Sequence, residues 1–477
     1  MNFRPGGFRR RVGPLRPVTG AQERTGLRSM WVAPRVFPSL EGRFLLYWEV
    51  VALLDIKFIV NNPDLVKKAV RDKNMDVDID RLLAVYDEVR ALTAETDSLR
   101  SERNSLSKEI PKLQGAEKER GIARVRELKD LIGTLEGRLA RCREEYENLM
   151  LQVPSVPLPE VPVGQGEEDN VEIRRVGEIP QFDFEFKDHL ELAEALDIVD
   201  IPRAVKIAGS RSYMLKNEGA LLELAVTRFV LDRLMAKGYT LLTVPVLVRE
   251  RAMIGTGYFP FGREQAYAVP EDDLFLAGTS EVPMVAFHQD EILSYRDLPL
   301  RYTALSTCFR REAGTYGKDT RGLYRVHQFQ KVEQVIFCPA DDALAEQLHM
   351  ELLANAEEIL QALELPYRVA LACTAEIGAG QVRKHEVETW MPSRNAYSET
   401  HSCSTLNDYQ SRRLNIKYRD SDGKSKYCYT LNNTGIASPR ILIPLLENHQ
   451  NADGSVTIPN ALRPYMNGLE KLTPKKR

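Results

Sequence analysis

The residues whose types and spacing could carry chemistry are concentrated between Phe309 and Glu333. This stretch has the pattern of strand, loop, strand, in which Arg310 and Glu312 end the first strand. Such a hairpin can hold a triphosphate, because the Arg310 guanidinium suits an α-phosphate and Glu312 can accept from an adenine amino group. A surface hairpin with salt bridges would not explain this density of charge and glycine. The loop glycines suit tight backbone geometry and are Gly314, Gly317 and Gly322.

The same stretch continues through Gly322-Leu323 and His327-Gln328-Phe329. In this form it resembles the second signature motif of class II aminoacyl-tRNA synthetases, in its bacterial-type seryl-tRNA synthetase version. The resemblance extends from about Leu54 to Tyr465 and implies an ATP-dependent serine–tRNA ligase. The catalytic residues it implies are Arg310, Glu312 and Arg440.

The resemblance also implies a serine pocket. Gly278-Thr279-Ser280-Glu281 is similar to the family's serine-binding loop, in which Glu281 would hold the ammonium group. Glu333 would complete the pocket by contacting the side-chain hydroxyl or the ammonium group. The family often has Gly-Ser-Gly where this chain has Asn433-Thr434-Gly435, and threonine retains the hydroxyl. The implied L-serine set is Thr279, Ser280, Glu281, Arg310, Glu333 and Thr434.

A further segment, Glu399-Thr400-His401-Ser402, resembles the family's site for ATP and magnesium. A carboxylate and a hydroxyl are hard oxygen ligands, so Glu399 and Ser402 are the predicted Mg²⁺ ligands, and ATP is a substrate. Arg440 resembles the arginine of the third class II motif, which contacts the γ-phosphate. The implied ATP set is Arg310, Arg311, Glu312, Val326, Glu399, Thr400, His401, Ser402 and Arg440.

The elements that must position these residues have the pattern of an α+β body. Residues 221–235 are apolar at helical spacing, and residues 441–450 indicate a second helix. Short runs rich in β-branched and apolar residues predict strands, and the first of these is interrupted by Pro245. Pro245 resembles the first class II motif, which implies a homodimer interface. We expect a mostly antiparallel sheet flanked by helices, with strands at 239–248, 302–308, 332–337 and 427–431.

Residues 81–150 carry two heptad seams, which predict an antiparallel helical hairpin with its reversal at Gln114-Gly115. Each helix of about 33 residues would be about 50 Å long. Residues 108–129 hold seven basic and four acidic residues, an excess that suits phosphate contacts but could equally be a solvated face. A dimerisation coil, or helices folded back on the core, would give the same seams. The resemblance implies a tRNA-binding arm that recognises the long variable arm of tRNA(Ser).

Changes in amino-acid composition along the chain indicate the domain boundaries. Prolines followed by Gly164-Gln165-Gly166 mark a linker, so we expect a tRNA-binding domain at 54–163 and a catalytic domain at 164–477. Residues 1–53 are rich in Arg, Gly and Pro. They are an organelle-targeting peptide, a disordered extension, or the result of an upstream start codon chosen in error. Because Gly and Pro break an amphipathic helix, we favour the disordered extension and a cytoplasmic enzyme, with the mitochondrion as the alternative.

Net charge, cysteine spacing and hydropathy are consistent with a tRNA-binding enzyme but do not by themselves indicate one. The net charge of −3 gives no global field for nucleic acid, so RNA binding must come from local patches. The six cysteines form no CxxC pair and no apolar run is long enough for a membrane span. The predicted function is activation of L-serine with ATP and transfer to tRNA(Ser), and to tRNA(Sec) where one exists. The rivals are a non-catalytic RNA-binding paralogue, a carrier-protein ligase and a structural coiled coil.

Overall fold

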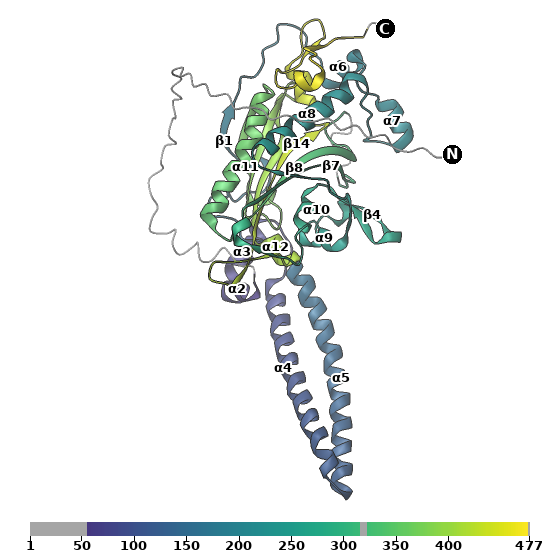
Figure 1. The fold of residues 1–477 in the computed structure, drawn as a ribbon, viewed down its shortest axis with the longest axis vertical. Helices are drawn as coiled ribbons and strands as arrows, with labels where there is room; N and C mark the ends of the chain where they lie inside the picture. The colour runs from purple at the N-terminus through teal and green to yellow at the C-terminus, as the bar shows by residue number, and fades with distance from the viewer. Residues whose placement is uncertain (1–54, 315–321, 476–477) are drawn as a thin grey trace, which may run out of the picture. The chain divides into compact units, whose positions relative to one another are not determined.

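The computed structural model describes residues 55–314 and 322–475 (Figure 1). The predicted extension at 1–53 and Gly317 lie outside the described residues. The first described elements are two short helices, α2 (Ile56–Asn61) and α3 (Pro63–Asp72). Asp55 caps α2, because its side chain accepts from the backbone N–H of Lys57 at 2.8 Å. Within these ranges no helix is both long and apolar enough to cross a membrane.

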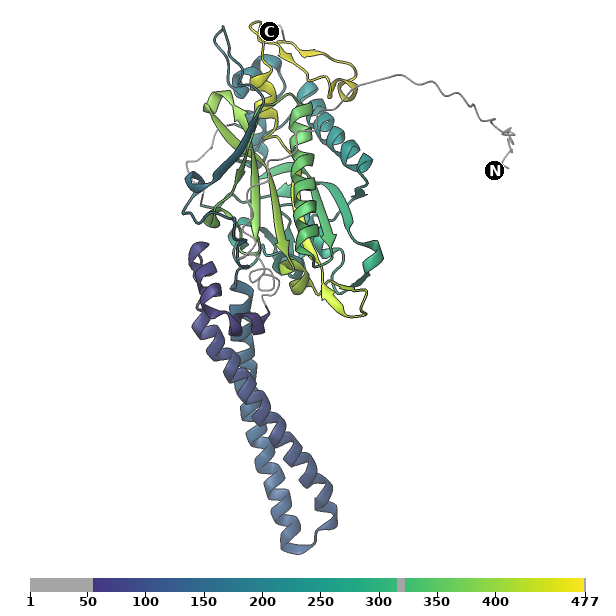
Figure 2. The same ribbon diagram turned by 90° about the vertical axis from the view of Figure 1, so that its left-hand side faces the viewer.

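The predicted helical hairpin is present. Helices α4 (Ile79–Glu109) and α5 (Gly115–Gln152) lie side by side and run in opposite directions (Figures 1 and 2). Leu92, Leu135 and Leu139 are buried in the seam between them. Arg81 donates two hydrogen bonds to the Glu145 carboxylate, each 2.7 Å long. The two heptad seams therefore pair with each other.

The reversal between the two helices takes place where the sequence predicts it. Pro111 lies in a short 3₁₀ turn (Ile110–Lys112), near the start of the turn, where its missing N–H costs no helical hydrogen bond. Helix α5 then begins at Gly115, whose φ of +56° is a left-handed conformation that favours glycine. Proline and glycine together allow the chain to turn back within a few residues.

The base of the hairpin is anchored to the body. The Lys73 ammonium, which is buried, donates to three backbone carbonyls, those of Gly378 and Ala379 at 3.0 Å and of Gln381 at 2.7 Å. The segment predicted to be a linker contacts the same loop, since the N–H of Ser155 donates to the Ala379 carbonyl at 2.8 Å. This segment is therefore packed against the body rather than a free spacer.

The body is built on an eight-stranded sheet with the order β1-β9-β10-β11-β14-β8-β7-β2, antiparallel except between β2 and β7. The predicted α+β class with a mostly antiparallel sheet is confirmed. The strands are β1 (Val171–Val176), β2 (Thr240–Leu242), β7 (Leu300–Phe309), β8 (Gln328–Cys338), β9 (Tyr367–Leu371), β10 (Arg383–Met391), β11 (Ala396–Asn407) and β14 (Tyr429–Ser438).

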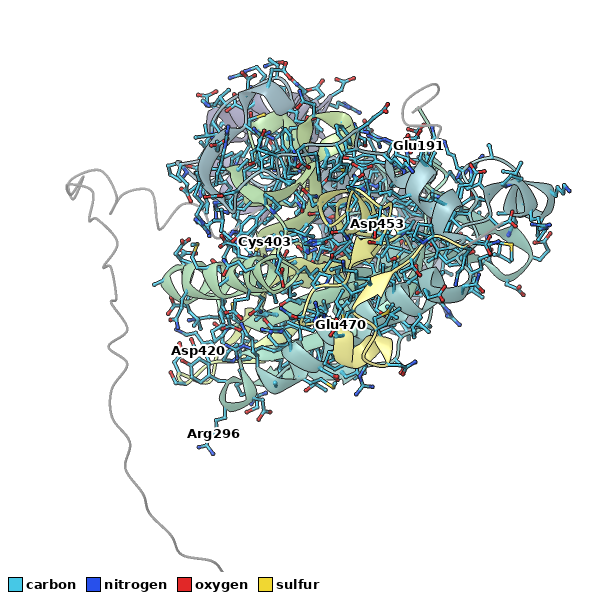
Figure 3. All side chains as sticks on the ribbon, turned by 90° about the horizontal axis from the view of Figure 1, so that it is seen from above. Glu191, Arg296, Cys403, Asp420, Asp453 and Glu470 are labelled. Carbon is cyan, nitrogen blue, oxygen red and sulfur yellow. The ribbon has the colours of Figure 1, made fainter. Side chains whose placement is uncertain are left out.

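The two faces of this sheet have different roles, as the alternation along β8 shows. Val332 and Ile336 belong to the main hydrophobic core, which includes apolar residues of helices α8 (Asn217–Ala236) and α11 (Asp342–Ala362). Lys331 and Glu333 point to the opposite face, because successive strand residues alternate. Figure 3, seen from above, shows Cys403 of β11 inside the body, where it is fully buried. The face away from α8 and α11 is left for the site.

Smaller elements complete the described body. The predicted strand at 239–248 is wrong as one element: β2 joins the large sheet, whereas β3 (Leu247–Arg249) pairs with β5 (Leu274–Leu276) in another. Pro245 lies between them and cannot donate a ladder hydrogen bond. The remaining helices and strands are α6 (His189–Leu196), α7 (Ile201–Ala208), α9 (Glu250–Gly255), α10 (Glu281–Ala286), α12 (Tyr409–Leu414), α13 (Leu442–Asn448), β4 (Tyr267–Val269), β6 (Ile292–Ser294), β12 (Lys417–Arg419), β13 (Ser425–Tyr427), β15 (Val456–Thr457) and β16 (Lys471–Leu472).

A buried histidine pair links α11 to β10 and makes stability depend on pH. His349 Nε2 lies 2.7 Å from His385 Nδ1, and His349 Nδ1 lies 2.8 Å from the Thr405 hydroxyl. Burial, reinforced by Arg383, lowers the pKa of His385 from 6.5 to about 3 and that of His349 well below its usual range. The unfolded chain therefore takes up protons below about pH 6.5 that the folded pair refuses, and stability is lost as pH falls.

We predict that His385 lowers the free energy of unfolding by about 1.2 kcal/mol as the pH falls from 6 to 5, and that His349 lowers it further in the same direction. His385→Gln should remove one histidine's share of that slope. Urea unfolding at a series of pH values measures it. Equal slopes in the wild-type protein and the variant would contradict the role of the pair.

Candidate active site

A cavity of about 500 Å³ opens on the face of the sheet that α8 and α11 leave free. Its walls come from β7, β8, β11 and β14 and from the segments that follow β5 and β7. Phe329 and Lys331 contribute from β8, on the same face as Glu333. Of the residues predicted from the sequence, the cavity is lined by Arg310, Glu312, Val326, Glu399, Thr400, Ser402, Thr434 and Arg440.

A β-bulge in β11 brings the two predicted magnesium ligands to one face. Glu386 of β10 pairs with Ser402, and Glu388 pairs with Glu399, so Thr400 is the extra residue. In a regular strand, residues three apart would point to opposite faces. Because the bulge adds one residue, Glu399 and Ser402 share the face that carries Glu386 and Glu388. A carboxylate and a hydroxyl at the same wall of the cavity form an oxygen donor set that fits Mg²⁺.

A second bulge lies in β14, next to the cavity residue Thr434. Thr434 pairs with Glu333, whereas Ile436 already pairs with Val332, so Gly435 is the extra residue. A side chain there would be crowded, since a Cβ on Gly435 would lie 3.1 Å from atoms of Val230 and Val332. Thr434 lies opposite Glu333 on the cavity face of the sheet, and the extra residue brings Ala437, three positions further along β14, to the same face.

The two predicted catalytic arginines are held by aromatic rings. The Arg310 guanidinium lies 5.2 Å from the centre of the Phe329 ring, and that of Arg440 lies 4.4 Å from the centre of the Tyr324 ring. Arg440 also donates to the Glu399 backbone carbonyl at 3.0 Å and lies 3.8 Å from its carboxylate. The guanidinium groups therefore face a common volume with their positions fixed.

Electrostatics keep Glu399 ionised. Burial opposes the charged form, but Arg440, Lys384 and Arg310 outweigh it and hold the pKa of Glu399 below its usual range. Lys384 in turn forms an ion pair with Glu386 at 2.6 Å, and both residues lie on β10, the strand next to that of Glu399. An anionic oxygen surrounded by cations is suited to a polyphosphate accompanied by a divalent cation.

Glu312 and Val326 lie at the rim formed by the ends of the hairpin. Glu312 has a φ of +51°, the left-handed conformation, three residues after the end of β7. Its carboxylate is 3.6 Å from a guanidinium nitrogen of Arg325. Val326, which is buried, gives this wall an apolar patch. A carboxylate acceptor next to apolar surface is an arrangement that can bind a nucleobase with an amino group.

The predicted serine residues form a buried acidic group next to the cavity. Thr279, Ser280, Glu281 and Glu333 are all buried. The Thr279 hydroxyl accepts from the N–H of Glu281 at 3.2 Å and gives a hydrogen bond to Glu333. Burial and then the neighbouring Glu333 raise the pKa of Glu281 to about 7. Burial also raises the pKa of Glu333, although Lys331 counteracts it. Two close carboxylates favour a cationic ligand, because an ammonium group relieves their repulsion.

Two predicted ATP residues are not among those lining the cavity. Arg311 has an exposed side chain, and its backbone N–H donates to the Gln265 carbonyl at 2.9 Å. His401 is buried, with Nε2 3.1 Å from the Gly435 carbonyl and Nδ1 3.0 Å from the Thr400 hydroxyl. Burial lowers the pKa of His401 to about 4. In this structure its contacts support the two bulges.

Other residues at the site were not predicted. Asn432 gives a hydrogen bond to Glu281, and its buried Oδ1 has no partner among the described residues. Lys331 pairs with Glu333, and Gln410 donates to Glu281 at 2.8 Å. Strand alternation with Glu333 could have indicated Lys331. No sequence pattern indicated Asn432, which reaches the site through the register of β14. Gln410 belongs to Asp408-Tyr409-Gln410, which follows the segment that resembles the family's ATP and magnesium site, but no contact with Glu281 was predicted for it.

Two protein-family models match this chain. Residues 267–449 match the tRNA synthetase class II core domain (G, H, P, S and T), and residues 53–157 match the seryl-tRNA synthetase N-terminal domain. A serine–tRNA ligase of Deinococcus radiodurans is 48% identical over 420 residues, which cover 88% of this chain and 99% of that protein. The chain belongs to the seryl-tRNA synthetase family.

Other seryl-tRNA synthetases are similar to this chain over almost the same length. The enzyme of Rubrobacter xylanophilus is 45% identical over 428 residues, 89% of this chain and all of that protein. The crystal structure of seryl-tRNA synthetase from Pyrococcus horikoshii complexed with ATP has a TM-score of 0.82 at 38% identity, covering 89% of this chain and all of that one. The predicted family and the predicted class II enzyme are confirmed.

Proposed function

We propose that the chain activates L-serine with ATP, releasing pyrophosphate, and then transfers serine from the adenylate to tRNA(Ser). The observation that carries this proposal is the division of charge in one site. Glu281 and Glu333 provide a buried acidic end, whereas Arg310 and Arg440 provide a cationic end. An amino acid has its ammonium group close to its carboxylate, so it can span the two ends with the carboxylate directed towards a bound triphosphate.

The proposed first step needs no general base. The serine carboxylate is ionised at neutral pH and attacks the α-phosphorus in line, so its oxygen forms the new bond while the bond to pyrophosphate breaks. Charge on the reacting phosphate is neutralised by Arg310, and charge on the leaving group by Arg440, both already positioned by their aromatic neighbours. Catalysis is then positioning and charge stabilisation. In the second step a hydroxyl of the terminal ribose of tRNA attacks the activated carbonyl and releases AMP.

Selection of serine follows from the small polar pocket. We assign the recognition of its hydroxyl to Thr434 and Glu333, which are paired across β14 and β8. Sites that hydrogen-bond a substrate hydroxyl can reject the analogue lacking it by about 10⁴-fold, so alanine should be excluded. Threonine is excluded by the lack of room for its methyl group, a weaker discrimination.

We assign Mg²⁺ to Glu399 and Ser402, since the bulge at Thr400 places both oxygen donors at the cavity wall. A Mg²⁺ ion held by Glu399 and Ser402 would neutralise negative charge on the bound triphosphate. Glu399→Gln should raise the Mg²⁺ concentration for half-maximal exchange activity by about tenfold or more, because it removes an anionic ligand. The matched control is Glu271→Gln, an exposed glutamate of another segment. Identical Mg²⁺ titrations for the wild-type protein and Glu399→Gln would contradict the assignment.

We assign tRNA recognition to the domain at 54–163 and catalysis to 164–477. Exposed basic side chains gather near the reversal of the hairpin and suit a phosphate backbone. They are Lys108, Lys112, Lys118, Arg120, Arg126 and Lys129. tRNA(Sec) is a proposed second substrate where a host has one, because the family's enzymes recognise the long variable arm that both tRNAs share. The cytoplasm remains the predicted location, with the mitochondrion as the alternative.

We also propose that the chain is a homodimer. Large apolar side chains are exposed at the edge strand β2 and on the neighbouring helix α8, at Leu241 and Leu224. Further exposed apolar residues follow Pro245, at Leu247 and Phe261. Exposed apolar surface of this kind marks protein–protein contact. Analytical ultracentrifugation tests it, and a monomer at micromolar concentration would contradict it.

Serine charging of a tRNA(Ser) transcript by the purified chain tests the whole proposal. We expect ATP-dependent attachment of radiolabelled serine that is lost when the transcript lacks its variable arm. A folded protein that binds this tRNA but neither charges it nor forms adenylate would instead establish the non-catalytic paralogue.

A further inference from the structure

The short helix α12 carries a buried glutamine whose side chain joins three elements of the body. Gln410 Nε2 donates to the Glu281 carboxylate at 2.8 Å and to the Thr256 carbonyl at 3.2 Å. Its Oε1 accepts from the Thr430 hydroxyl at 2.8 Å. Thr256 ends α9, Glu281 begins α10 and Thr430 lies on β14. Gln410 is 1% exposed, so these contacts exclude water.

The orientation of this amide is fixed by its partners. A backbone carbonyl and an ionised carboxylate can only accept, so the NH₂ group of Gln410 must face Thr256 and Glu281. The carbonyl oxygen is then left for the Thr430 hydroxyl, which can donate. Both N–H groups and the oxygen have partners, and a buried group with every bond made has a single preferred position.

Glu281 depends on such a partner. Its carboxylate is buried at the first residue of α10 and faces Glu333, with Lys331, Tyr258 and Asn432 also near it. Burial and Glu333 disfavour the ionised form, while the hydrogen bond from Gln410 and that from Asn432 favour it. Without Gln410 the carboxylate would be both less ionised at neutral pH and free to change rotamer.

We propose that Gln410 is a positioning residue for amino-acid recognition, which holds the Glu281 carboxylate in the orientation that receives the substrate ammonium group. This inference rests on the proposed function, in which Glu281 binds serine. Gln410 acts through Glu281. Neither side chain lines the cavity, and Glu281 belongs to the buried acidic group next to it.

The helix that carries Gln410 has other anchors, so the side chain is not required to hold α12 in place. The Arg413 guanidinium lies 3.4 Å from the centre of the Tyr409 ring and donates to the Leu151 carbonyl at 3.4 Å. A Cβ added to Gly257 or Gly380 would lie less than 3 Å from the Tyr409 ring, which shows how closely the chain surrounds it. Loss of the Gln410 amide should therefore change the orientation and ionisation of the Glu281 carboxylate, while α12 stays in place.

The test is Gln410→Met, which keeps the length of the side chain and removes its polar atoms. Since a buried charge-assisted hydrogen bond is lost, the KM for serine in ATP–pyrophosphate exchange should rise by about 10- to 100-fold. The KM for ATP and the kcat at saturating serine should stay within about twofold, because the phosphate end is untouched. Gln450→Met is the matched control, a buried glutamine that bonds to the Lys187 and Glu447 carbonyls. It should leave every constant unchanged.

The pH profile provides a readout that a merely structural defect would not move. Serine binding needs an ionised Glu281. In the wild-type protein the KM for serine should therefore fall as the pH rises through the Glu281 pKa of about 7. In Gln410→Met this fall should shift to higher pH. Thr430→Val, which removes the donor to the Gln410 oxygen, should shift serine KM in the same direction by less, and it carries the test if Gln410→Met does not fold.

Glu281→Gln separates the two levels of the inference. If Glu281→Gln leaves serine KM unchanged, the proposed serine pocket is wrong. If Glu281→Gln raises serine KM but Gln410→Met and Thr430→Val leave both serine KM and the pH profile as in the wild-type protein, the positioning role of Gln410 is wrong and the pocket stands.

Discussion

Arg310→Ala should abolish serine-dependent ATP–pyrophosphate exchange, with a loss of at least about 1,000-fold. Arg310 lines the cavity next to Phe329 and is the group we assign to the α-phosphate, where charge develops as the adenylate forms. Arg310→Lys should recover only part of the activity, because an ammonium group keeps the charge but cannot make the paired hydrogen bonds of a guanidinium.

The control for this prediction is Arg296→Ala. Arg296 is exposed and lies at the periphery of the body in Figure 3, so its loss should not alter exchange. Circular dichroism and the thermal midpoint establish that each variant is folded. A folded Arg310→Ala protein that retains exchange would contradict the role assigned to Arg310.

Shortening the helical hairpin should separate the two steps of the reaction. Deletion of residues 95–131, bridged by a short Gly-Ser turn, keeps the contacts of Leu92, Leu135 and Leu139 and the pair between Arg81 and Glu145. Exchange should continue at about the wild-type rate, while the KM for tRNA should rise by about 100-fold or more, because the basic residues near the reversal are lost.

A full-length variant with Lys112, Lys118 and Arg120 changed to glutamine gives the intermediate case. These side chains are exposed, so the hairpin should fold, and tRNA affinity should fall with a smaller dependence on salt. If the deletion charges tRNA(Ser) as well as the wild-type protein does, the hairpin is not the tRNA-binding arm. The alternative of a dimerisation coil then predicts loss of the dimer.

Features with a strong period or a local motif could be predicted from the sequence. The heptads around Leu92 and Leu135 predict the two helices, because apolar seams must be buried, and the structure shows that these two seams pair with each other. The charged and glycine residues between two apolar runs predict that the first strand ends near Phe309, whereas the second strand begins at Gln328, four residues before the predicted start at 332. The family resemblance then placed Arg310, Glu312 and Arg440, and the structure brings all three to one cavity.

Features that depend on register could not be predicted. Glu399 and Ser402 are three residues apart, a spacing that separates them in a regular strand, and only the bulge at Thr400 brings them together. The bulge at Gly435 likewise brings Thr434 and Ala437, which are also three residues apart, to one face of the sheet. The run at 239–248 looked like one strand, because composition does not show that its two ends join different sheets.

Contacts between residues far apart in the chain could not be predicted from the sequence either. Gln410 lies far from Glu281 in the chain and reaches it only because α12 packs beside α10 and β14. Likewise, Lys73 finds its partners in the carbonyls of residues 378–381, which no side-chain pattern marks.

Exchange of pyrophosphate into ATP, measured with serine, threonine, alanine and glycine in parallel, tests the central claim most directly. If Glu281, Glu333 and Thr434 form a serine pocket next to Arg310, exchange should be strong with serine, weak with threonine and near background with alanine and glycine. A folded protein that gives no exchange with any of the four, or that prefers another of them to serine, would contradict it.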